Sequence, residues 1–359
     1  MNKEVFELLA LAVDRGASDL HLAAGNPPLL RVHGVLDPLP DRAPLTDAGV
    51  RAIIQDIIGE ERLGEIENVR EFDGSFALPS GHRIRINVYI QNETLAAALR
   101  VLPSEFYPVD KLGLPKSACM QIIKLHQGLV LVTGATGSGK TTTIASLVNE
   151  INRTRPVHIH TIEDPIEYVH VSKRAFVTQR EVGRDSGSFA EATRRSLRQD
   201  PDVVVIGEMR DTETMETALT LAETGHLTFA TLHTSNAVQT ISRVISAFPA
   251  EQQPQIRIQL ATTLAFVICQ QLIPKLDNEG RSLAAEVLVV TPAVRALIRE
   301  NKTHQLRMTM QTGCDHDMST MNQSLGALVK TGMISKNDAM DYSDDKQELV
   351  DLMQETHGN

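Results

Sequence analysis

The stretch GLVLVTGATGSGKTTT occupies residues 128–143 and joins a continuous apolar run to a glycine-rich turn. Residues 134–141 match all eight positions of the P-loop pattern, in which glycines let the backbone turn tightly and direct N–H groups toward phosphate oxygens. The uninterrupted apolar run is typical of a strand buried on both sheet faces. We expect a helix at about 139–152, whose positive end faces the same anion. Strand, turn and helix together favour a phosphate site over a chance glycine-rich turn.

The predicted phosphate cradle supplies both a cation and a metal ligand. Lys140 is expected to reach the β- and γ-phosphates of ATP, and the Thr141 hydroxyl is expected to ligate Mg²⁺. The residues predicted to bind the nucleotide are Gly134, Ala135, Thr136, Gly137, Ser138, Gly139, Lys140, Thr141 and Thr142. ATP and Mg²⁺ are therefore the cofactors that this stretch predicts.

After this stretch, strands alternate with helices, which is the pattern of a parallel sheet with helices on both faces. Strands are expected at residues 157–163, 202–208 and 226–233, and helices at 188–198, 211–224 and 236–247. From about residue 251 onward we expect mainly helices, apart from a strand near 283–290. The fold class predicted for this part of the chain is α/β.

Acidic side chains follow two of these predicted strands. An acid at the carboxyl end of a parallel strand lies beside the bound phosphates, so Glu208 is predicted to be the carboxylate on the Mg²⁺ side, usually through water. Glu163 and Asp164 lie in the segment TIEDPIE at 161–167. Hydrolysis needs a group that orients and deprotonates the attacking water. Glu163 is the first candidate for this base and Asp164 the second, although Asp-Pro is also a common turn pair.

Histidines begin and end predicted strands. His233 ends the strand at 226–233, where an imidazole could donate a hydrogen bond to the γ-phosphate and report its loss, and His226 begins the same strand. A lone histidine is more often structural, so both interpretations remain open. His158 and His160 point the same way from another strand with no third ligand at metal spacing, and we interpret them as structural.

Arginines usually meet the charge that develops on the γ-phosphate during transfer. Three candidates lie far from the P-loop in the sequence, on a predicted hairpin and the strand after it: Arg83, Arg85 and Arg100. A second set lies on one predicted helix: Arg194, Arg195 and Arg198. An exposed basic strand face would explain the first set equally well.

The first hundred residues predict a separate α+β unit. A first helix would place Val5, Leu8, Leu9 and Ala12 on one face. Strands are expected at 18–22, 29–36 and about 94–102, a helix from about Thr46 to Leu63, and a hairpin of two alternating arms on either side of Pro79-Ser80-Gly81. The segment 103–114 contains two prolines and little periodicity, so we expect domains at 1–102 and 115–359 with a linker between them.

Composition narrows the function classes. Hydrophobic residues make up 42% and charged residues 22%, as in a soluble globular protein. The three cysteines are far apart, which argues against a disulfide framework and a four-cysteine zinc site. The formal net charge of −10 disfavours sequence-independent binding of nucleic acid. No apolar stretch approaches the roughly 20 residues of a membrane span, so we expect a cytoplasmic protein that reaches a membrane only through partners.

Several motifs together resemble the PilT group of secretion ATPases. They are GASDLHL (16–22), RIRIN (83–87), GATGSGKTTT (134–143), TIEDPIE (161–167), VTQREVG (177–183), SLRQDPDVVVIGEMRD (196–211), AETGHLTFATLHTSNA (222–237) and VRALIRE (294–300). The resemblance runs from near residue 4 to about residue 340. Only the P-loop among these motifs would occur in many unrelated families.

This resemblance implies a PAS-like N-terminal domain, a RecA-like ATPase domain with a helical C-terminal region, and a homohexameric ring. It places each nucleotide between the two domains, with Arg83, Arg85 and Arg100 closing on the phosphates. Glu163 and Asp164 then form the acidic box, and His226 and His233 the histidine box. VRALIRE corresponds to the element associated with pilus retraction. Thr291, just before it, can cap a helix that carries an apolar stripe. The implied partners are an inner-membrane platform protein at the pilus base and, in some systems, a paralogous pilus ATPase.

Other functions stay open at this level. Glu93 stands where the family usually has a basic residue, and Ala293-Val294-Arg295 replaces its usual opening, which leaves room for an accessory PilU-like paralogue. Pilus-extension and type II secretion ATPases usually carry a longer N-terminal region and a four-cysteine insertion, and neither is found here. A nucleic-acid motor would need stacking aromatics, but the chain has no Trp and only 4% aromatic residues. A non-catalytic scaffold is disfavoured by intact Lys140, Glu163 and Glu208.

Overall fold

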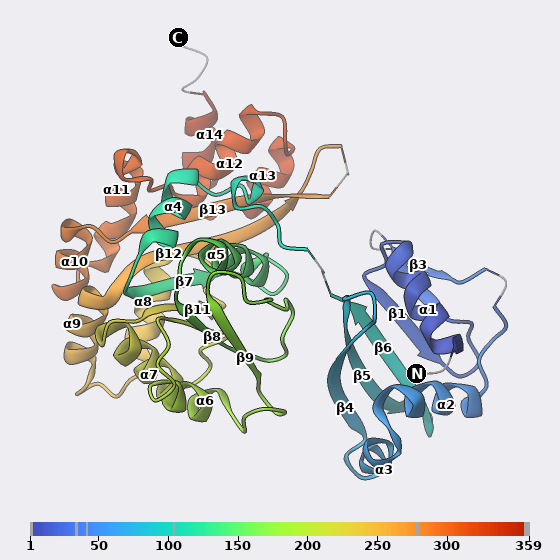
Figure 1. Ribbon diagram of the computed structural model, residues 1–359. Coiled ribbons are helices and arrows are strands. Elements are labelled where there is room, and N and C mark those ends of the chain that lie inside the picture. Colours follow the sequence, from blue (N-terminus) through green and yellow to red (C-terminus); the bar gives the residue numbers. More distant parts are fainter. Residues whose placement is uncertain (1–2, 33–34, 41, 103–104, 278–279, 355–359) are drawn as a thin grey trace. The chain divides into compact units, whose positions relative to one another are not determined.

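A computed structural model describes residues 3–32, 35–40, 42–102, 105–277 and 280–354. The chain divides into two compact units (Figure 1). One unit consists of Met1–Glu105 with Pro165–Val169, and the other of Phe106–Asp164 with His170–Asn359. Residues 103–104 of the predicted linker lie outside the described residues, and the linker itself stays a prediction.

The first unit is an antiparallel sheet with helices on one face. The strands lie in the order β3-β2-β1-β6-β5-β4. Their bounds are β1 Asp19–Ala23, β2 Leu29–Val32, β3 Val35–Pro38, β4 Glu71–Ala77, β5 Arg83–Gln91 and β6 Thr94–Val101. The helices are α1 Lys3–Asp14, α2 Asp47–Ile58 and α3 Glu60–Val69. Val5, Leu8, Leu9 and Ala12 of α1 are buried in this core, which confirms the predicted apolar face of the first helix.

The hairpin of β4 and β5 is confirmed, and its register explains the alternation seen in the sequence. Ile84, Ile86 and Val88 are fully buried, whereas Arg83 and Arg85, which alternate with them along β5, are half-buried on the other face. Period-two alternation therefore directs one row of side chains into the core and the other away from it.

Two predictions for this unit were wrong in detail. The helix expected from Thr46 to Leu63 is broken at Gly59, where a φ of 87° lies outside the helical region and separates α2 from α3. The strand expected at 29–36 is two strands, β2 and β3, which pair antiparallel to each other. The first error arises because the break at Gly59 lies inside an apolar segment and leaves the hydrophobic pattern nearly unchanged.

The second unit contains a mostly parallel sheet in the order β13-β12-β7-β11-β10-β8-β9. The strands are β7 Gly128–Thr133, β8 His158–Glu163, β9 Phe176–Glu181, β10 Val203–Ile206, β11 Leu227–Leu232, β12 Leu264–Pro274 and β13 Arg281–Val289. All neighbouring strands are parallel except β12 and β13. This arrangement confirms the α/β class predicted for this part of the chain.

Helices cover both faces of this sheet (Figure 1). They are α4 Lys116–Lys124, α5 Lys140–Thr154, α6 Phe189–Ser196, α7 Thr212–Glu223, α8 Ala237–Ser246 and α9 Gln253–Thr263. The C-terminal helices are α10 Pro292–Arg299, α11 Leu306–Gln311, α12 Met321–Lys330, α13 Lys336–Tyr342 and α14 Lys346–Gln354. No helix among the residues that the structure describes is long and apolar enough to cross a membrane.

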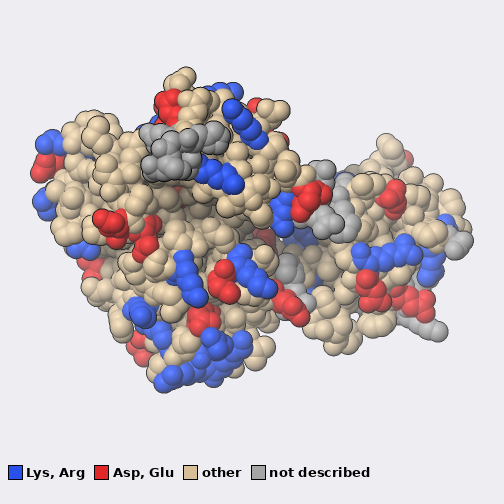
Figure 2. Space-filling view, turned by 90° about the horizontal axis from the view of Figure 1, so that it is seen from above, with Lys and Arg blue, Asp and Glu red and all other residues tan. Residues whose placement is uncertain are grey.

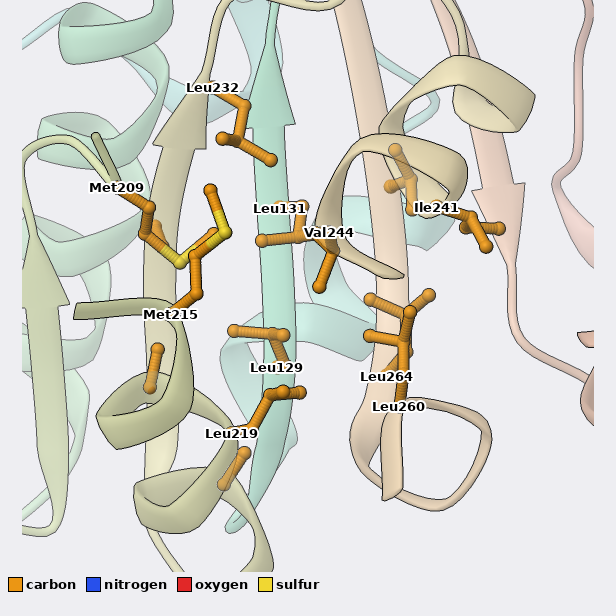
Figure 3. Close-up of a cluster of buried hydrophobic side chains, with 14 of the residues drawn as sticks. Leu129, Leu131, Met209, Met215, Leu219, Leu232, Ile241, Val244, Leu260 and Leu264 are labelled. Carbon is orange, nitrogen blue, oxygen red and sulfur yellow. The ribbon is translucent and has the colours of Figure 1, made fainter. Parts of the chain in front are cut away.

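Strand β7 shows why an uninterrupted apolar run is needed before the P-loop. Leu129 and Leu131 pack with Leu219 of α7 and Val244 of α8 on one face (Figure 3). Val130 and Val132 belong to the core on the opposite face. A strand with both faces covered favours apolar side chains at successive positions, so the sequence from Leu129 to Val132 is a continuous hydrophobic segment.

Two strands of this sheet were missed. Strand β9 reads FVTQRE and forms an edge of the sheet, so its residues are mostly half-buried and carry no clear apolar alternation. Strand β12 begins at Leu264 directly after α9 ends at Thr263, so no turn residues separate it from a helical pattern. The expectation of mainly helices beyond residue 251 was therefore wrong for this eleven-residue strand.

The predicted helix around VRALIRE is confirmed. The Thr291 side chain accepts a hydrogen bond from the Val294 N–H, and Pro292 occupies the first turn. Val294 and Ile298 are fully buried, and Leu297 packs against the same core. The arginines Arg295 and Arg299 are both exposed, as expected from their positions on the other side of the helix.

Candidate nucleotide-binding site

The P-loop connects β7 to α5 through a turn that only glycine accommodates at its first position. Gly134 has a φ of 138°, and a Cβ atom there would lie 2.4 Å from the Gln270 carbonyl oxygen and 2.6 Å from the Ser138 hydroxyl. Gly139 at the N-cap of α5 is left-handed, with a φ of 90°. These glycines bend the chain so that the loop wraps the N-terminus of α5, where helix N–H groups are available to an anion.

Lys140 begins α5 and lies back across the loop. Its ammonium group donates hydrogen bonds to the carbonyl oxygens of Gly134 and Ala135, at 2.8 and 3.0 Å. Ala135, Thr136 and Gly137 at the crest of the loop are exposed. The Ser138 hydroxyl is buried and has no hydrogen-bond partner among the described residues. A charged group beside exposed backbone amides and an unpartnered buried hydroxyl are features that suit a phosphate ligand.

The strand order brings the other predicted elements to the same edge of the sheet. Strand β7 pairs with β11, β11 with β10, and β10 with β8, all in parallel. The carboxyl ends of these four strands therefore lie side by side. Glu163, Glu208 and His233 each lie at or just beyond such an end. This is the edge at which open α/β sheets bind their ligands.

Glu208 is the centre of a charged cluster at that edge. One of its oxygens lies 2.7 Å from the Arg210 guanidinium, and the other lies 3.1 Å from His233 Nε2. The same guanidinium lies 3.7 Å from an Asp164 oxygen. Burial alone would raise the pKa of Glu208, but the hydrogen bond and charge of Arg210, with His233, hold that pKa below its usual value. Glu208 is therefore a carboxylate near neutral pH, as a ligand on the metal side must be.

Glu163 is held by neighbours on its own and the adjacent strand. Its Oε1 atom accepts hydrogen bonds from the Thr161 hydroxyl at 2.6 Å and from the Gln179 amide at 3.0 Å. Thr161 is buried, while Glu163 itself is half-buried. The carboxylate thus has a fixed orientation at the end of β8, and a general base needs such an orientation to meet its water.

The two predicted histidines are separated by the length of β11. His233 follows the strand and contacts Glu208, as described above. His226 precedes it at the amino end, where its Nδ1 lies 2.9 Å from the Leu221 carbonyl oxygen. Because β7 and β11 are parallel, the P-loop is at the opposite end from His226. Within one chain the structure therefore brings only His233 to the phosphate edge.

The hairpin arginines lie in the first unit and are paired there. Arg83 donates to the Ser75 hydroxyl at 2.7 Å, Arg85 lies 3.7 Å from Asp73, and Arg100 lies 2.8 Å from Asp19. Arg85 and Arg100 are direct cross-strand neighbours in register. They form part of a charged sheet face, and their role at the phosphates stays a prediction.

The second set of arginines lies on and just after α6 and points to solvent. Arg194 pairs with Glu213 and Arg195 with Glu191, and both arginines are exposed. On the face of the molecule shown in Figure 2, basic side chains are interspersed with acidic ones, and one group of basic side chains lies together at the lower edge of the view.

His158 and His160 fit the structural interpretation. Both rings have a nitrogen within 2.9 Å of the Thr178 hydroxyl. Burial lowers the pKa of His160 to about 4, so this ring is neutral. Among the described residues, no cluster of three or more His, Cys, Asp or Glu side chains has the geometry of a metal site.

A cavity of about 510 Å³ adjoins the P-loop, and apart from Gly139 and Thr142 its lining residues were not predicted to bind the nucleotide. It is lined on one side by Gly139, Thr142 and Thr143 and elsewhere by apolar and basic residues of the same unit. Its basic residues are Lys111, Lys275 and Arg281. The Arg281 guanidinium lies 3.5 Å from the Gly137 carbonyl oxygen. The volume is within the range of small-molecule sites, and the position suits the remainder of a nucleotide whose phosphates occupy the loop.

Three residues of the site were not predicted from the sequence: Arg210, Gln179 and Arg281. All three lie on segments that are far from the P-loop along the chain. Arg210 and Gln179 left a usable signal, because they lie in the motifs quoted at 196–211 and 177–183. The contacts of Gln179 and Arg281 depend on β9 and β12–β13, and β9 and β12 were not predicted.

Comparison with known proteins places this geometry in a family. Residues 5–357 match the model of the family described as type II/IV secretion system protein. The chain is 46% identical over 336 residues to the type IV pilus retraction ATPase PilT of Pseudomonas aeruginosa, covering 94% of this chain and 97% of that protein. It is 36% identical over 346 residues to the type IV pilus ATPase PilU of the same organism, covering 96% and 90%.

A solved structure agrees over nearly the whole length. The crystal structure of the pilus retraction motor PilT with bound ADP superposes with a TM-score of 0.90 at 46% sequence identity. The match covers 96% of this chain and 98% of that chain. The agreement confirms the predicted order of an N-terminal α+β domain followed by a RecA-like ATPase domain, and it assigns nucleotide binding and ATPase activity to the chain.

Proposed function

The chain belongs to the type II/IV secretion system protein family, and on that premise we propose that it is an ATP-driven motor for retraction of type IV pili. The observation that carries the proposal is the near full-length identity of 46% to a retraction ATPase, together with a complete P-loop at the same sheet edge as Glu163 and Glu208. ATP hydrolysis supplies the work, and twitching motility is the expected cellular outcome.

The chemistry follows from the arrangement at the sheet edge. The P-loop amides and Lys140 hold the phosphates, and Mg²⁺ would be held by the Thr141 hydroxyl and, through water, by Glu208. Bound Mg²⁺ neutralises phosphate charge. Glu163 orients and deprotonates the attacking water, with Asp164 beside it. His233, in contact with Glu208, responds to loss of the γ-phosphate.

The charge on the transferring phosphate needs a further cation, and Arg83, Arg85 and Arg100 are our candidates. We place them at the nucleotide in a homohexameric ring, where His226 acts at a subunit interface rather than at its own P-loop. The ring works at the cytoplasmic face of the inner membrane, against a platform protein at the pilus base. Segment 103–114 is the proposed hinge between the two domains.

An accessory retraction ATPase is the second candidate, and Glu93 is the observation in its favour. Glu93 lies in the tight turn between β5 and β6 and has a φ of 64°. Glu93 would repel a neighbouring acidic group, whereas a basic residue at this position would attract it. The identity of 46% to PilT against 36% to PilU favours the main motor.

Gene deletion with complementation separates these candidates. The main motor is supported if deletion abolishes twitching and leaves excess surface pili, and if the unmodified gene restores twitching but the Lys140→Ala gene does not. Retained twitching that weakens only under load supports the accessory role. Loss of surface pili would overturn retraction altogether and indicate an extension ATPase.

A further inference from the structure

Gln179 lies between the candidate base and the backbone of a neighbouring segment. Its amide nitrogen donates to Glu163 Oε1 at 3.0 Å. Its carbonyl oxygen accepts a hydrogen bond from the His170 backbone N–H at 2.7 Å. The primary amide of glutamine donates hydrogen bonds through its nitrogen and accepts them through its oxygen, and it carries no charge. Both of its ends are thus used, and the pair of bonds fixes which end faces Glu163.

His170, whose backbone N–H binds Gln179, also makes an aromatic contact through its side chain. The His170 ring lies against the Phe106 ring, with centroids 4.6 Å apart. Burial lowers the pKa of His170 to about 4, so the ring is neutral and stacks as an aromatic group at physiological pH. The His170 backbone N–H that holds Gln179 is therefore anchored by packing of its own side chain.

These residues occupy the points where the chain passes between its two compact units. Phe106 is the first residue of the second unit, and His170 is the first residue after the segment Pro165–Val169, which groups with the first unit. Glu163 lies one residue before Asp164, after which that same segment begins. Glu163, Phe106 and His170 therefore lie next to points where the chain passes from one compact unit to the other. Gln179 is hydrogen-bonded to Glu163 and to the His170 backbone.

We propose that Gln179 is a positioning residue for Glu163, and that the Phe106–His170 stack ties the orientation of this carboxylate to the chain segments joining the two units. This inference rests on the proposed role of Glu163 as the base. Oriented by Thr161 and Gln179, the carboxylate faces its water. If the stack is released, the amide loses its fixed partner and the carboxylate is free to rotate.

Substitutions at Gln179 test the first part. Gln179→Met keeps the length and removes both hydrogen bonds, and Gln179→Glu keeps the acceptor for His170 but places a second carboxylate against Glu163. We expect kcat for ATP to fall at least tenfold in Gln179→Met and further in Gln179→Glu. The KM and the Kd of a non-hydrolysable ATP analogue should stay within twofold. This division between kcat and binding is not expected from a general structural defect.

Thr178→Val provides the matched control on the same strand, because Thr178 contacts His158 and His160 rather than Glu163. Its kcat should stay within twofold, and melting temperatures identify any variant that fails to fold. Should Gln179→Met turn over at the unmodified rate, or should KM rise in step with the fall in kcat, the positioning role is overturned.

Phe106→Ala tests the second part, because it removes the ring that packs against His170 and changes no atom of Gln179 or Glu163. We expect kcat to fall three- to tenfold with unchanged nucleotide affinity, whereas Phe106→Tyr, which retains a stacking ring, should restore it. An unchanged kcat in Phe106→Ala would overturn the connection to the chain segments joining the two units. Failure of the proposed base is distinguishable: Glu163→Gln would then retain turnover, whatever the Gln179 variants do.

Discussion

His233 Nε2 lies 3.1 Å from Glu208 Oε1 at the carboxyl edge of the parallel sheet, although the two residues follow different strands. The other Glu208 oxygen is bound by Arg210 at 2.7 Å. Glu208 therefore has a cation on one side and an imidazole on the other before any metal is considered. Its ionisation, and with it the expected hold on Mg²⁺, depends on these two neighbours.

Removal of Arg210 should make turnover more sensitive to acid. In Arg210→Met the burial that raises the pKa of Glu208 remains, while the strongest influences that lower it are lost. Glu208 then binds a proton at a higher pH, so the loss of kcat on acidification should begin at a higher pH. A pH–rate profile from 4.5 to 8 measures the displacement. Arg153→Met, which removes an exposed pair with Glu150, is the control and should leave the profile unchanged.

The P-loop lysine and the candidate base should fail in different ways. Lys140→Ala removes the cation that meets the phosphates, so both ATP binding and turnover should be lost. Glu163→Gln keeps the shape of the side chain and the phosphate site, so ATP should still bind while turnover falls about 100-fold or more. Steady-state ATPase assays with parallel titration of a fluorescent ATP analogue check both. Unchanged turnover in Glu163→Gln would remove this residue as the base.

Gly134 and Gly137 should differ sharply in their tolerance of a methyl group. Gly134→Ala places a Cβ atom 2.4 Å from the Gln270 carbonyl oxygen, a backbone atom of β12 that cannot move aside without disturbing the sheet. Gly137→Ala meets nothing within 4 Å and only carries the strain of a left-handed φ, about 1–2 kcal/mol. Urea denaturation should show a larger loss of unfolding free energy for Gly134→Ala. Equal losses would mean that the loop and β12 are less closely packed than described.

Glu286 should be important for stability because it joins two helices to the sheet. Its buried carboxylate accepts the backbone N–H of Ala237 at 2.7 Å and of Met321 at 3.4 Å, at the starts of α8 and α12. Glu286→Ala leaves both N–H groups without this acceptor, and we expect a loss of about 2–4 kcal/mol. The exposed Glu300→Ala should leave the unfolding midpoint unchanged.

The pH dependence of this stability has a definite sign. Burial raises the pKa of Glu286 above its ordinary value of 4.5, so the folded state binds this proton more tightly than the unfolded chain. The resulting stabilisation is full below that ordinary pKa and is lost as pH rises through the folded one. The stability advantage of the unmodified protein over Glu286→Gln should therefore shrink between pH 4.5 and neutrality. A constant difference across that range would contradict the raised pKa.

Whether a site residue can be predicted from the sequence depends on whether it belongs to a contiguous pattern of residues. The P-loop is a contiguous segment that needs specific residue types in order, and Glu208 and Glu163 each end a recognisable strand. Arg210 and Gln179 lie in quoted motifs, but a motif does not show which side chains its residues contact, and Arg281 lies outside every motif. The contact of Gln179 with Glu163 exists only once β9 has paired with β8 in the sheet.

The sequence by itself determined the phosphate cradle of residues 134–141 and the α/β class, because glycine spacing and hydrophobic periodicity are properties of short segments. The family was indicated by the resemblance of several motifs taken together. The sequence already placed His226 and His233 at opposite ends of one strand, but only the tertiary structure decided that His233 contacts Glu208. Only the tertiary structure also joined Gln179 to Glu163. Strand order is set by packing of the whole sheet, and no local pattern encodes which strand ends will meet.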